Sequence, residues 1–328
     1  MEIRQIGITG VKVSVLGLGA APLGGNFVDL DDNQAAGVVS EAISAGLTYF
    51  DTAPWYGFGR SERTVGNALR GLNFTISTKV GRILKPGAVP DPENYGMINP
   101  LPFYPVYDYS YDGIMRAYED SLQRLGIDRV DIILVHDIGT FQHGEENEKY
   151  FNELKFGGYR AVDELRANGD VKAIGLGVNE NKICLDALDI GDWDVFLLAG
   201  RYTLLEQAAL DKLFPACKNR NTSIICAGPF NSGVLVGREM WNYATAPKSV
   251  VEKVGALQKI ADRYGVSLPA AALQFPLANS IVSSVIPGPR SKGEVTEILQ
   301  WFSEETPQEF WLDLKSQGLL HERAPVPE

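Results

Sequence analysis

The sequence has few residues of the types that build disulfides and metal centres. It contains three cysteines and three histidines in 328 residues. The cysteines, Cys184, Cys217 and Cys226, are odd in number and form no CxxC pair, so we expect small core residues rather than a disulfide framework or a structural zinc site. The histidines include no HxH pair, and metal-dependent barrels usually need several clustered ligands. We therefore predict no metal.

Two further absences bear on the partners and on the location of the protein. The chain has no block of Lys and Arg, and its 30 basic against 41 acidic residues give a formal charge of −11, which argues against a nucleic-acid or anionic-membrane partner. No apolar run is long enough to span a membrane, and the opening MEIRQIGITGVKVSVLGLG lacks the basic segment and continuous apolar stretch of a secretion signal. We expect a cytoplasmic protein.

Strand-like and helix-like segments alternate along the whole chain. A typical helical segment runs from residue 32 to residue 46, with its apolar residues on one face and a glycine at its end. Eight such units without a break in composition predict one (β/α)8 barrel domain over residues 1–328. The predicted strands are residues 15–19, 48–51, 74–80, 130–135, 173–178, 195–198, 223–227 and 283–286.

Two segments lie outside these eight units. Residues 1–14 predict a β-hairpin that turns at Thr9-Gly10 and closes the bottom of the barrel. Residues 85–112, after the third strand, form a long loop with six prolines and six aromatic residues. Loops of this length inside a compact domain are usually functional, so we expect this one at the catalytic face, as part of the substrate site or as a lid.

Polar residues follow the second, third and fourth predicted strands. Asp51, Lys79 and His136 close these strands, and Tyr56 stands in the Pro/Gly turn after Asp51. Catalytic side chains of such barrels come from the carboxyl ends of the strands, which are neighbours here. A buried Asp51 needs a partner, which Lys79 can supply, and the ammonium of Lys79 would lower the pKa of Tyr56 into the range of an acid/base catalyst.

Each of these four residues also has a structural explanation when it is taken alone. A strand-end aspartate often caps a helix or a turn, a strand-end lysine is usually solvated, and a lone histidine is more often a hydrogen-bonded structural residue. Their combination on adjacent strands is what indicates catalysis, with His136 orienting a substrate oxygen. A barrel hydrolase with paired carboxylates is an alternative, although no motif supports it.

The four residues, in this order and on these strand ends, resemble the catalytic tetrad of the aldo-keto reductase superfamily. The segments FDTAPWYGFGRSERTVGNAL (50–69) and VIPGPRS (285–291) are similar to the second-strand and adenine-nucleotide segments of that superfamily. Within it, VYDYSYDG (106–113), AGRYTLLEQ (199–207) and GPFNSGVL (228–235) resemble the D-threo-aldose 1-dehydrogenase subgroup, which includes L-fucose, L-galactose and pyridoxal 4-dehydrogenases.

The resemblance implies an NAD(P)-dependent oxidoreductase that acts on a sugar or an aldehyde. In the subgroup a ring hemiacetal of L-fucose, L-galactose or D-arabinose type, or of pyridoxal, is oxidised to a lactone by direct hydride transfer to nicotinamide. Asp51, Tyr56, Lys79 and His136 would be the catalytic residues. The alternatives are a reductase of other aldehydes or ketones and a redox-inactive nicotinamide-binding subunit. We expect a monomer or a weak homo-oligomer.

The resemblance also implies where the cofactor binds. Enzymes of the superfamily that prefer NADP tend to have an arginine where Glu294 aligns, so the sequence predicts NAD, with NADP possible because of the nearby Arg290. The aromatic residue that commonly stacks on the nicotinamide is replaced by Ala227, for which Phe230 is a candidate substitute. The residues expected at the cofactor are Asn179, Gly228, Phe230, Asn231, Ser232, Gly233, Gly288, Arg290, Ser291 and Glu294.

Aromatic residues near Tyr56 are candidates for the substrate pocket. Trp55 precedes Tyr56, and Tyr104 and Tyr107 belong to the long loop. Aromatic faces suit sugar C–H edges or a pyridine ring. The alternative is that these tyrosines pack the loop onto the barrel rim.

Overall fold

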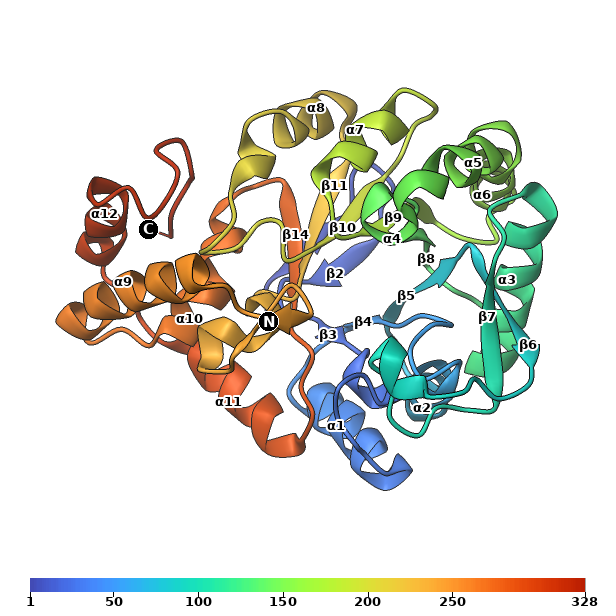
Figure 1. Cartoon of the computed structure of the whole chain (residues 1–328), viewed down its shortest axis with the longest axis horizontal. Helices are drawn as coiled ribbons and strands as arrows, with labels where there is room; N and C mark the ends of the chain where they lie inside the picture. The colour runs from blue at the N-terminus through green and yellow to red at the C-terminus, as the bar shows by residue number, and fades with distance from the viewer. Residues whose placement is uncertain (328) are drawn as a thin grey trace.

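The computed structural model is a closed barrel of parallel strands inside a ring of helices (Figure 1). It describes residues 1–327. The predicted (β/α)8 fold is confirmed, and each strand lies within two residues of its predicted start and end, apart from the first, which is shorter. The barrel strands are β3 (Leu18–Gly19), β4 (Tyr49–Asp51), β5 (Thr75–Val80), β8 (Ile132–His136), β9 (Ala173–Val178), β10 (Val195–Ala199), β11 (Ser223–Ala227) and β14 (Val282–Ile286).

The strands pair in chain order, and backbone hydrogen bonds close the barrel between its first and last strands. Gly17 N donates to Val285 O at 3.0 Å, and Gly19 N donates to Pro287 O at 2.9 Å. Neighbouring strands are in parallel register along the rest of the sheet, as the alternation of strands and helices requires.

Helices cover the outside of the barrel, and the longer ones are amphipathic, with buried apolar residues on one face. Helix α1, for example, begins at a capping box in which Asp31 and Gln34 satisfy each other's backbone N–H groups. The helices are α1 (Asp32–Ser44), α2 (Arg60–Leu69), α3 (Tyr111–Leu125), α4 (Thr140–His143), α5 (Asn147–Glu153), α6 (Tyr159–Asn168), α7 (Asn181–Leu188), α8 (Leu213–Arg220), α9 (Lys248–Tyr264), α10 (Leu268–Gln274), α11 (Lys292–Ser303) and α12 (Gln308–Ser316).

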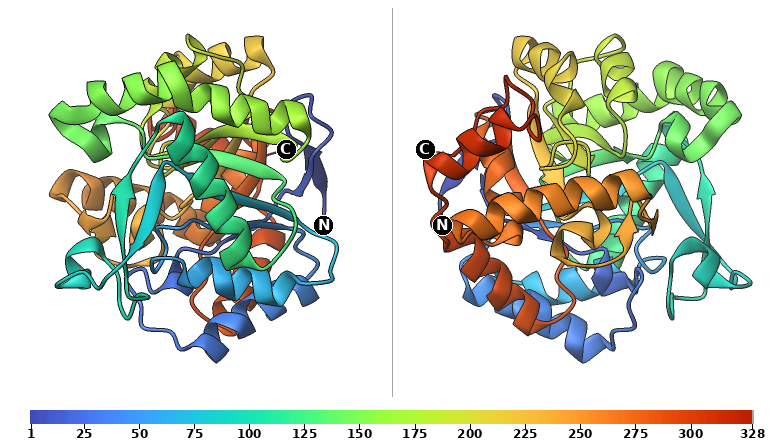
Figure 2. Two further views of the ribbon diagram at one scale, coloured as in Figure 1. Left: turned by 90° about the vertical axis from the view of Figure 1, so that its right-hand side faces the viewer. Right: turned by 60° about the vertical axis from the view of Figure 1, so that its left-hand side comes forward.

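Two antiparallel hairpins lie at opposite ends of the barrel (Figure 2). Strands β1 (Ile3–Gln5) and β2 (Lys12–Ser14) form the predicted N-terminal hairpin. At the other end, β6 (Arg82–Pro86) pairs with β7 (Phe103–Tyr107). The prediction of one continuous loop over residues 85–112 was therefore wrong. Strands β6 and β7 form a two-stranded ribbon, and the loop between them is shorter, from residue 87 to residue 102.

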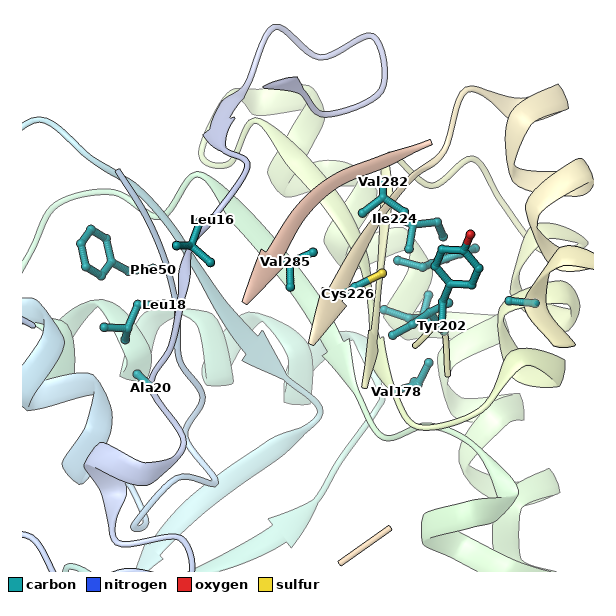
Figure 3. Close-up of a cluster of buried hydrophobic side chains, with 14 of the residues drawn as sticks. Leu16, Leu18, Ala20, Phe50, Val178, Tyr202, Ile224, Cys226, Val282 and Val285 are labelled. Carbon is teal, nitrogen blue, oxygen red and sulfur yellow. The ribbon is translucent and has the colours of Figure 1, made fainter. Parts of the chain in front are cut away.

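The hydrophobic core has two layers. The larger layer lies between the barrel strands and the helices, and Figure 3 shows part of it, with Leu16, Phe50 and Val285 among the labelled side chains. The smaller layer fills the barrel and includes Ile6 and Val13 of the N-terminal segment. All three cysteines are buried and free, as expected, and Cys226 lies among the apolar side chains of Figure 3.

Residues 1–327 contain neither a candidate membrane-spanning helix nor a candidate metal cluster. None of the helices there is both long and apolar enough to cross a bilayer. Within the same residues, no group of three or more His, Cys, Asp or Glu side chains is arranged to hold a metal ion.

Candidate active site

A buried ion pair forms the centre of the site. Lys79 Nζ donates to Asp51 Oδ2 at 2.7 Å and to the Thr52 carbonyl at 2.8 Å, and both charged side chains are almost fully buried. Ser77 Oγ donates to the other Asp51 oxygen at 2.6 Å. Because Asp51 lies opposite Ser77 in the register and side chains alternate along a strand, Asp51, Ser77 and Lys79 all face the barrel interior. The predicted pairing of Asp51 with Lys79 is confirmed.

Tyr56 is held in a turn that is packed backbone against backbone. The 3-10 helix η1 (Pro22–Gly24) crosses this turn, and a Cβ on Gly57 would lie 2.0 Å from Gly24 O. Gly57 also has a φ of 62°, which lies in the left-handed region that residues with a side chain rarely adopt. Two glycines are therefore needed here, because they let η1 brace the turn that carries Tyr56.

The pKa of Tyr56 differs from the sequence prediction. Lys79 Nζ lies 4.8 Å from the centroid of the Tyr56 ring, so the two groups are adjacent as expected. The pKa of Tyr56 is nevertheless raised well above 10, first by burial and then by the negative charges of Asp51 and Asp137, while Arg82 opposes the shift. The predicted lowering of this pKa was wrong for the protein alone, because burial and the charges of Asp51 and Asp137 raise it.

His136 completes the group at the end of β8. Its ring lies edge-on to Tyr56, with centroids 5.9 Å apart and an interplanar angle of 88°. Burial lowers the pKa of His136 well below 6.5, and the positive charges of Arg82 and Lys79 lower it further. The imidazole is therefore neutral near pH 7. The structure brings all four residues of the predicted tetrad together.

Two charged side chains beside His136 were not predicted from the sequence: Arg82, which is buried, and Asp137, which is partly buried. Arg82 Nη2 donates to Asp137 Oδ2 at 2.6 Å, and Arg82 Nη1 lies 3.3 Å from His136 Nδ1. Arg82 follows the end of β5 after one glycine, and Asp137 directly follows β8, so their places next to the strand ends were the available signal.

The loop after β11 is the first segment predicted to bind the cofactor. Asn231, Ser232 and Gly233 have consecutive left-handed φ values of 47°, 61° and 107°, and the N–H groups of Asn231 and Gly233 donate to the carbonyls of Gly228 and Phe230 within the loop. Asn231 Nδ2 donates to the Gly200 carbonyl, while its buried Oδ1 has no hydrogen-bond partner within residues 1–327. Gly228 also takes a left-handed φ of 58° at the start of this loop. The unpaired Asn231 Oδ1 is an acceptor, so it fits a hydrogen-bond donor of a bound dinucleotide rather than its pyrophosphate.

Glu294 holds together residues 288–294, the segment predicted to bind the adenosine end of the cofactor. This carboxylate accepts from Arg290 N at 2.7 Å and from Arg290 Nε at 2.9 Å, and Arg238 lies 3.3 Å away. Burial opposes ionisation, but the hydrogen bonds from Arg290 give Glu294 a lowered pKa. Ser291 caps α11 by accepting from Glu294 N, and Gly288 lies against Pro22, where a Cβ would be 3.0 Å from that ring.

At the predicted nicotinamide end of the site, Asn179 contacts Tyr243, a residue that was not predicted from the sequence. Asn179 Nδ2 donates to Asp137 Oδ1 at 3.2 Å, and Asn179 Oδ1 accepts from the Tyr243 hydroxyl at 3.0 Å. Tyr243 sits in the two-residue turn between β12 (Met240–Trp241) and β13 (Ala244–Thr245) and stacks on Phe27 at 6.3 Å. An isolated tyrosine in WNYATAPK gives no sequence signal of this contact.

Phe230, the predicted nicotinamide-stacking residue, packs against a helix of the outer ring. Its ring packs edge-on against Trp301 of α11, with centroids 5.9 Å apart. The aromatic side chain that reaches Asn179 is instead that of Tyr243.

The predicted substrate aromatics separate into two groups. Trp55 and Tyr107 lie on either side of the Arg82 guanidinium, at 4.3 Å and 5.3 Å from Cζ to the ring centroids, which places both beside His136. Tyr104 lies three residues before Tyr107 on β7, so it points to the opposite face of the ribbon. It is 38% exposed and is not brought to the tetrad.

Comparisons with known proteins agree with this geometry. Residues 15–317 match the aldo/keto reductase family. The chain is 43% identical to a pyridoxal 4-dehydrogenase of Microbacterium luteolum, over 97% of this chain and 98% of that protein, and 34% identical to a D-threo-aldose 1-dehydrogenase of a Pseudomonas species, over 95% and 96%. The holo form of an aldo-keto reductase from Bacillus halodurans superposes with a TM-score of 0.74 at 24% identity, over 100% and 98% of the two chains.

The chain is a nicotinamide-dependent oxidoreductase. The chain belongs to the aldo/keto reductase family, as the family match over most of its length and the two relatives above 30% identity show. The resemblance seen in the sequence is thereby confirmed, including its subgroup.

Proposed function

We propose that the protein oxidises the ring hemiacetal of pyridoxal to a lactone, with NAD as the hydride acceptor. The observation that carries the reaction type is the Asp51–Lys79 pair beneath Tyr56, with His136 beside it. Pyridoxal is placed first because the pyridoxal 4-dehydrogenase is 43% identical over nearly all of both chains. An aldose is the second candidate, supported by the 34% identity to the D-threo-aldose 1-dehydrogenase.

The four tetrad residues divide the work of moving one proton and orienting one oxygen. Tyr56 Oη accepts the hemiacetal proton in the oxidation and returns it in the reverse reaction, and Lys79 stabilises the phenolate while Asp51 fixes the ammonium. His136 donates to the substrate oxygen from a neutral ring. Bound nicotinamide supplies the hydride acceptor.

The chain's own residues suggest how the cofactor is held. Asn179 binds the carboxamide, and Tyr243, rather than Phe230, lies on the nicotinamide side of the site. The turn from Gly228 to Gly233 holds the pyrophosphate, and the segment from Gly288 to Glu294 holds the adenosine. Trp55 and Tyr107 form the aromatic wall of the substrate pocket.

NAD is preferred over NADP because Glu294 is ionised and occupies both nearby arginines. Arg290 and Arg238 are paired with this carboxylate, so neither is free for a 2′-phosphate. Glu294→Gln removes the competing charge and should raise the ratio of kcat/KM for NADP to that for NAD about tenfold, which is roughly 1.4 kcal/mol. A wild-type enzyme that already favours NADP would contradict the cofactor assignment.

The experiment that tests the function is a panel of substrates with both cofactors. Reduced cofactor is followed by absorbance with pyridoxal, L-fucose, L-galactose and D-arabinose, and the lactone product is identified by mass spectrometry. The proposal predicts the highest kcat/KM with pyridoxal and NAD. A sugar in first place would support the second candidate. Tight cofactor binding without turnover of any compound, in either direction, would indicate a redox-inactive nicotinamide-binding protein.

A further inference from the structure

The contacts of Arg82 determine which nitrogen of His136 carries the proton. Arg82 Nη1 lies 3.3 Å from His136 Nδ1 in a buried contact. A guanidinium has donors and no acceptor, so Nδ1 must be the acceptor in this hydrogen bond and carries no hydrogen. A neutral imidazole has one N–H, which is therefore on Nε2.

The rest of the site holds Arg82 in this position. It is the first residue of β6 and lies opposite Tyr107 in the ribbon register. Its guanidinium is enclosed by the rings of Trp55 and Tyr107, and its Nη2 is anchored by Asp137 Oδ2 at 2.6 Å. Arg82 Nε is buried without a hydrogen-bond partner within residues 1–327. The hydrogen bonds between Arg82 and Asp137 therefore do not fully offset the free energy lost when the guanidinium leaves water.

Asp137 links this arrangement to the cofactor side. It directly follows His136 and takes a left-handed φ of 48°, which turns its carboxylate back toward the strand end. One oxygen accepts from Arg82, and the other accepts from Asn179 Nδ2 at 3.2 Å. His136 Nε2 lies 3.4 Å from the oxygen bound to Arg82, so the N–H edge of the ring borders the same carboxylate.

We propose that Arg82, anchored by Asp137, is a positioning residue that fixes His136 as the Nε2–H tautomer and so presents one N–H to the substrate oxygen. The catalytic part of this inference rests on the proposed function, because it assumes that His136 binds a reacting oxygen. The tautomer itself does not depend on it. The charged and titratable groups that face His136 are Arg82, Lys79, Asp137, Tyr56 and Tyr109.

Nitrogen NMR of the histidines tests the tautomer without any activity measurement. The chain has three histidines, and the variants His143→Gln and His321→Gln assign the resonances of His136 by elimination. The proposal predicts an unprotonated Nδ1 and a protonated Nε2 in the wild-type protein from about pH 6 to about pH 8. A hydrogen on Nδ1, or an imidazolium in this range, would overturn it.

Variants of Arg82 test whether this residue causes the tautomer. In Arg82→Met the methionine retains much of the length without donors, so His136 should lose its single tautomer, and kcat should fall about 10-fold to 100-fold while KM for NAD stays within about twofold. Arg82→Lys restores one cationic donor and should recover part of both signals. An unchanged His136 spectrum in Arg82→Met would refute the assignment.

A matched control separates positioning from general loss of stability. Arg166 forms an ion pair with Asp194 at 2.9 Å just before β10, away from the strand ends that carry the tetrad. Arg166→Met should leave the His136 spectrum and kcat unchanged. If Arg82→Met does not fold, Asp137→Asn takes its place, because asparagine keeps the side-chain shape and tolerates the left-handed φ of this residue. The proposal predicts that His136 loses its single tautomer in Asp137→Asn as well. If no substrate turns over, the proposed function fails, while the wild-type spectrum still decides the tautomer.

Discussion

The two ends of the barrel interior bury different kinds of side chain. At the end where the strands begin, Ile6, Val11 and Val13 of the N-terminal segment close the barrel with apolar groups. At the end where the strands finish, the interior holds Asp51 and Lys79 together with Arg82 and His136. One end therefore has the composition of an ordinary core, and the other has a composition that a core avoids.

The difference indicates which end carries stability and which carries chemistry. Apolar burial stabilises the fold by roughly 25 cal/mol per Å². Buried charges lose hydration on folding, and even well-formed pairs contribute little net stability. Under the proposed function, the reaction accounts for the charged end, while the stability of the fold accounts for the apolar N-terminal hairpin.

The largest expected effect is the loss of the Tyr56 hydroxyl. Tyr56→Phe keeps the ring beside His136 and removes the group that moves the proton, so kcat should fall about 10²-fold to 10⁴-fold with little change in the free energy of unfolding. Steady-state kinetics and urea unfolding measure the two quantities. The control Tyr118→Phe removes a hydroxyl that donates to the Asp170 carbonyl on the outside of the barrel, and it should retain its kcat.

Removal of one partner of the central ion pair should affect both stability and activity. Lys79→Met leaves the Asp51 carboxylate buried without its cation, which should cost about 3–5 kcal/mol of unfolding free energy and abolish most activity. The double variant Asp51→Asn with Lys79→Met removes both charges and should recover a large part of the stability but none of the activity. Recovery of activity in the double variant would contradict the role of Lys79.

Truncation at the apolar end should produce the opposite pattern. Ile6 is fully buried in the barrel-filling cluster, so Ile6→Ala should lower the free energy of unfolding by about 2–5 kcal/mol. Ile6→Val is the graded control and should cost about 0.5–1.5 kcal/mol. Both variants should keep kcat within about twofold at temperatures where they are folded, and a specific loss of kcat would weaken the division between the two ends.

The two reaction directions should depend on pH in different ways. Burial, Asp51 and Asp137 hold the pKa of Tyr56 above 10, so its phenol stays protonated at neutral pH. Oxidation needs the deprotonated form and should rise up to about tenfold per pH unit between about pH 7 and pH 9, whereas reduction needs the phenol and should stay level. An oxidation rate that falls with pH in this range would contradict Tyr56 as the base.

The residues that the sequence placed correctly are those whose position follows from a periodic pattern. Apolar runs located the strands, and the polar residues at their carboxyl ends identified Asp51, Lys79 and His136 as candidates. The parallel register then brings these side chains together without further information, because all of them face the interior at the same end.

The features that the sequence did not reveal depend on contacts between distant segments. The ribbon of β6 and β7 is hidden by prolines such as Pro86 and Pro105, which disfavour central strands but are tolerated in a two-stranded ribbon. Arg82 and Asp137 acquire their roles by pairing across 55 positions. The pKa of Tyr56 depends on the balance of burial and two carboxylates, which only the three-dimensional arrangement gives.

The most direct test of the central claim compares one variant from each end of the barrel in the same assay. The rate of NAD reduction by pyridoxal and the free energy of unfolding are measured for the wild type, Tyr56→Phe and Ile6→Ala. The account predicts that Tyr56→Phe loses at least about 100-fold in rate and keeps its stability, while Ile6→Ala loses stability and keeps its rate. A Tyr56→Phe protein that turns over at the wild-type rate would contradict the assignment of chemistry to the charged end.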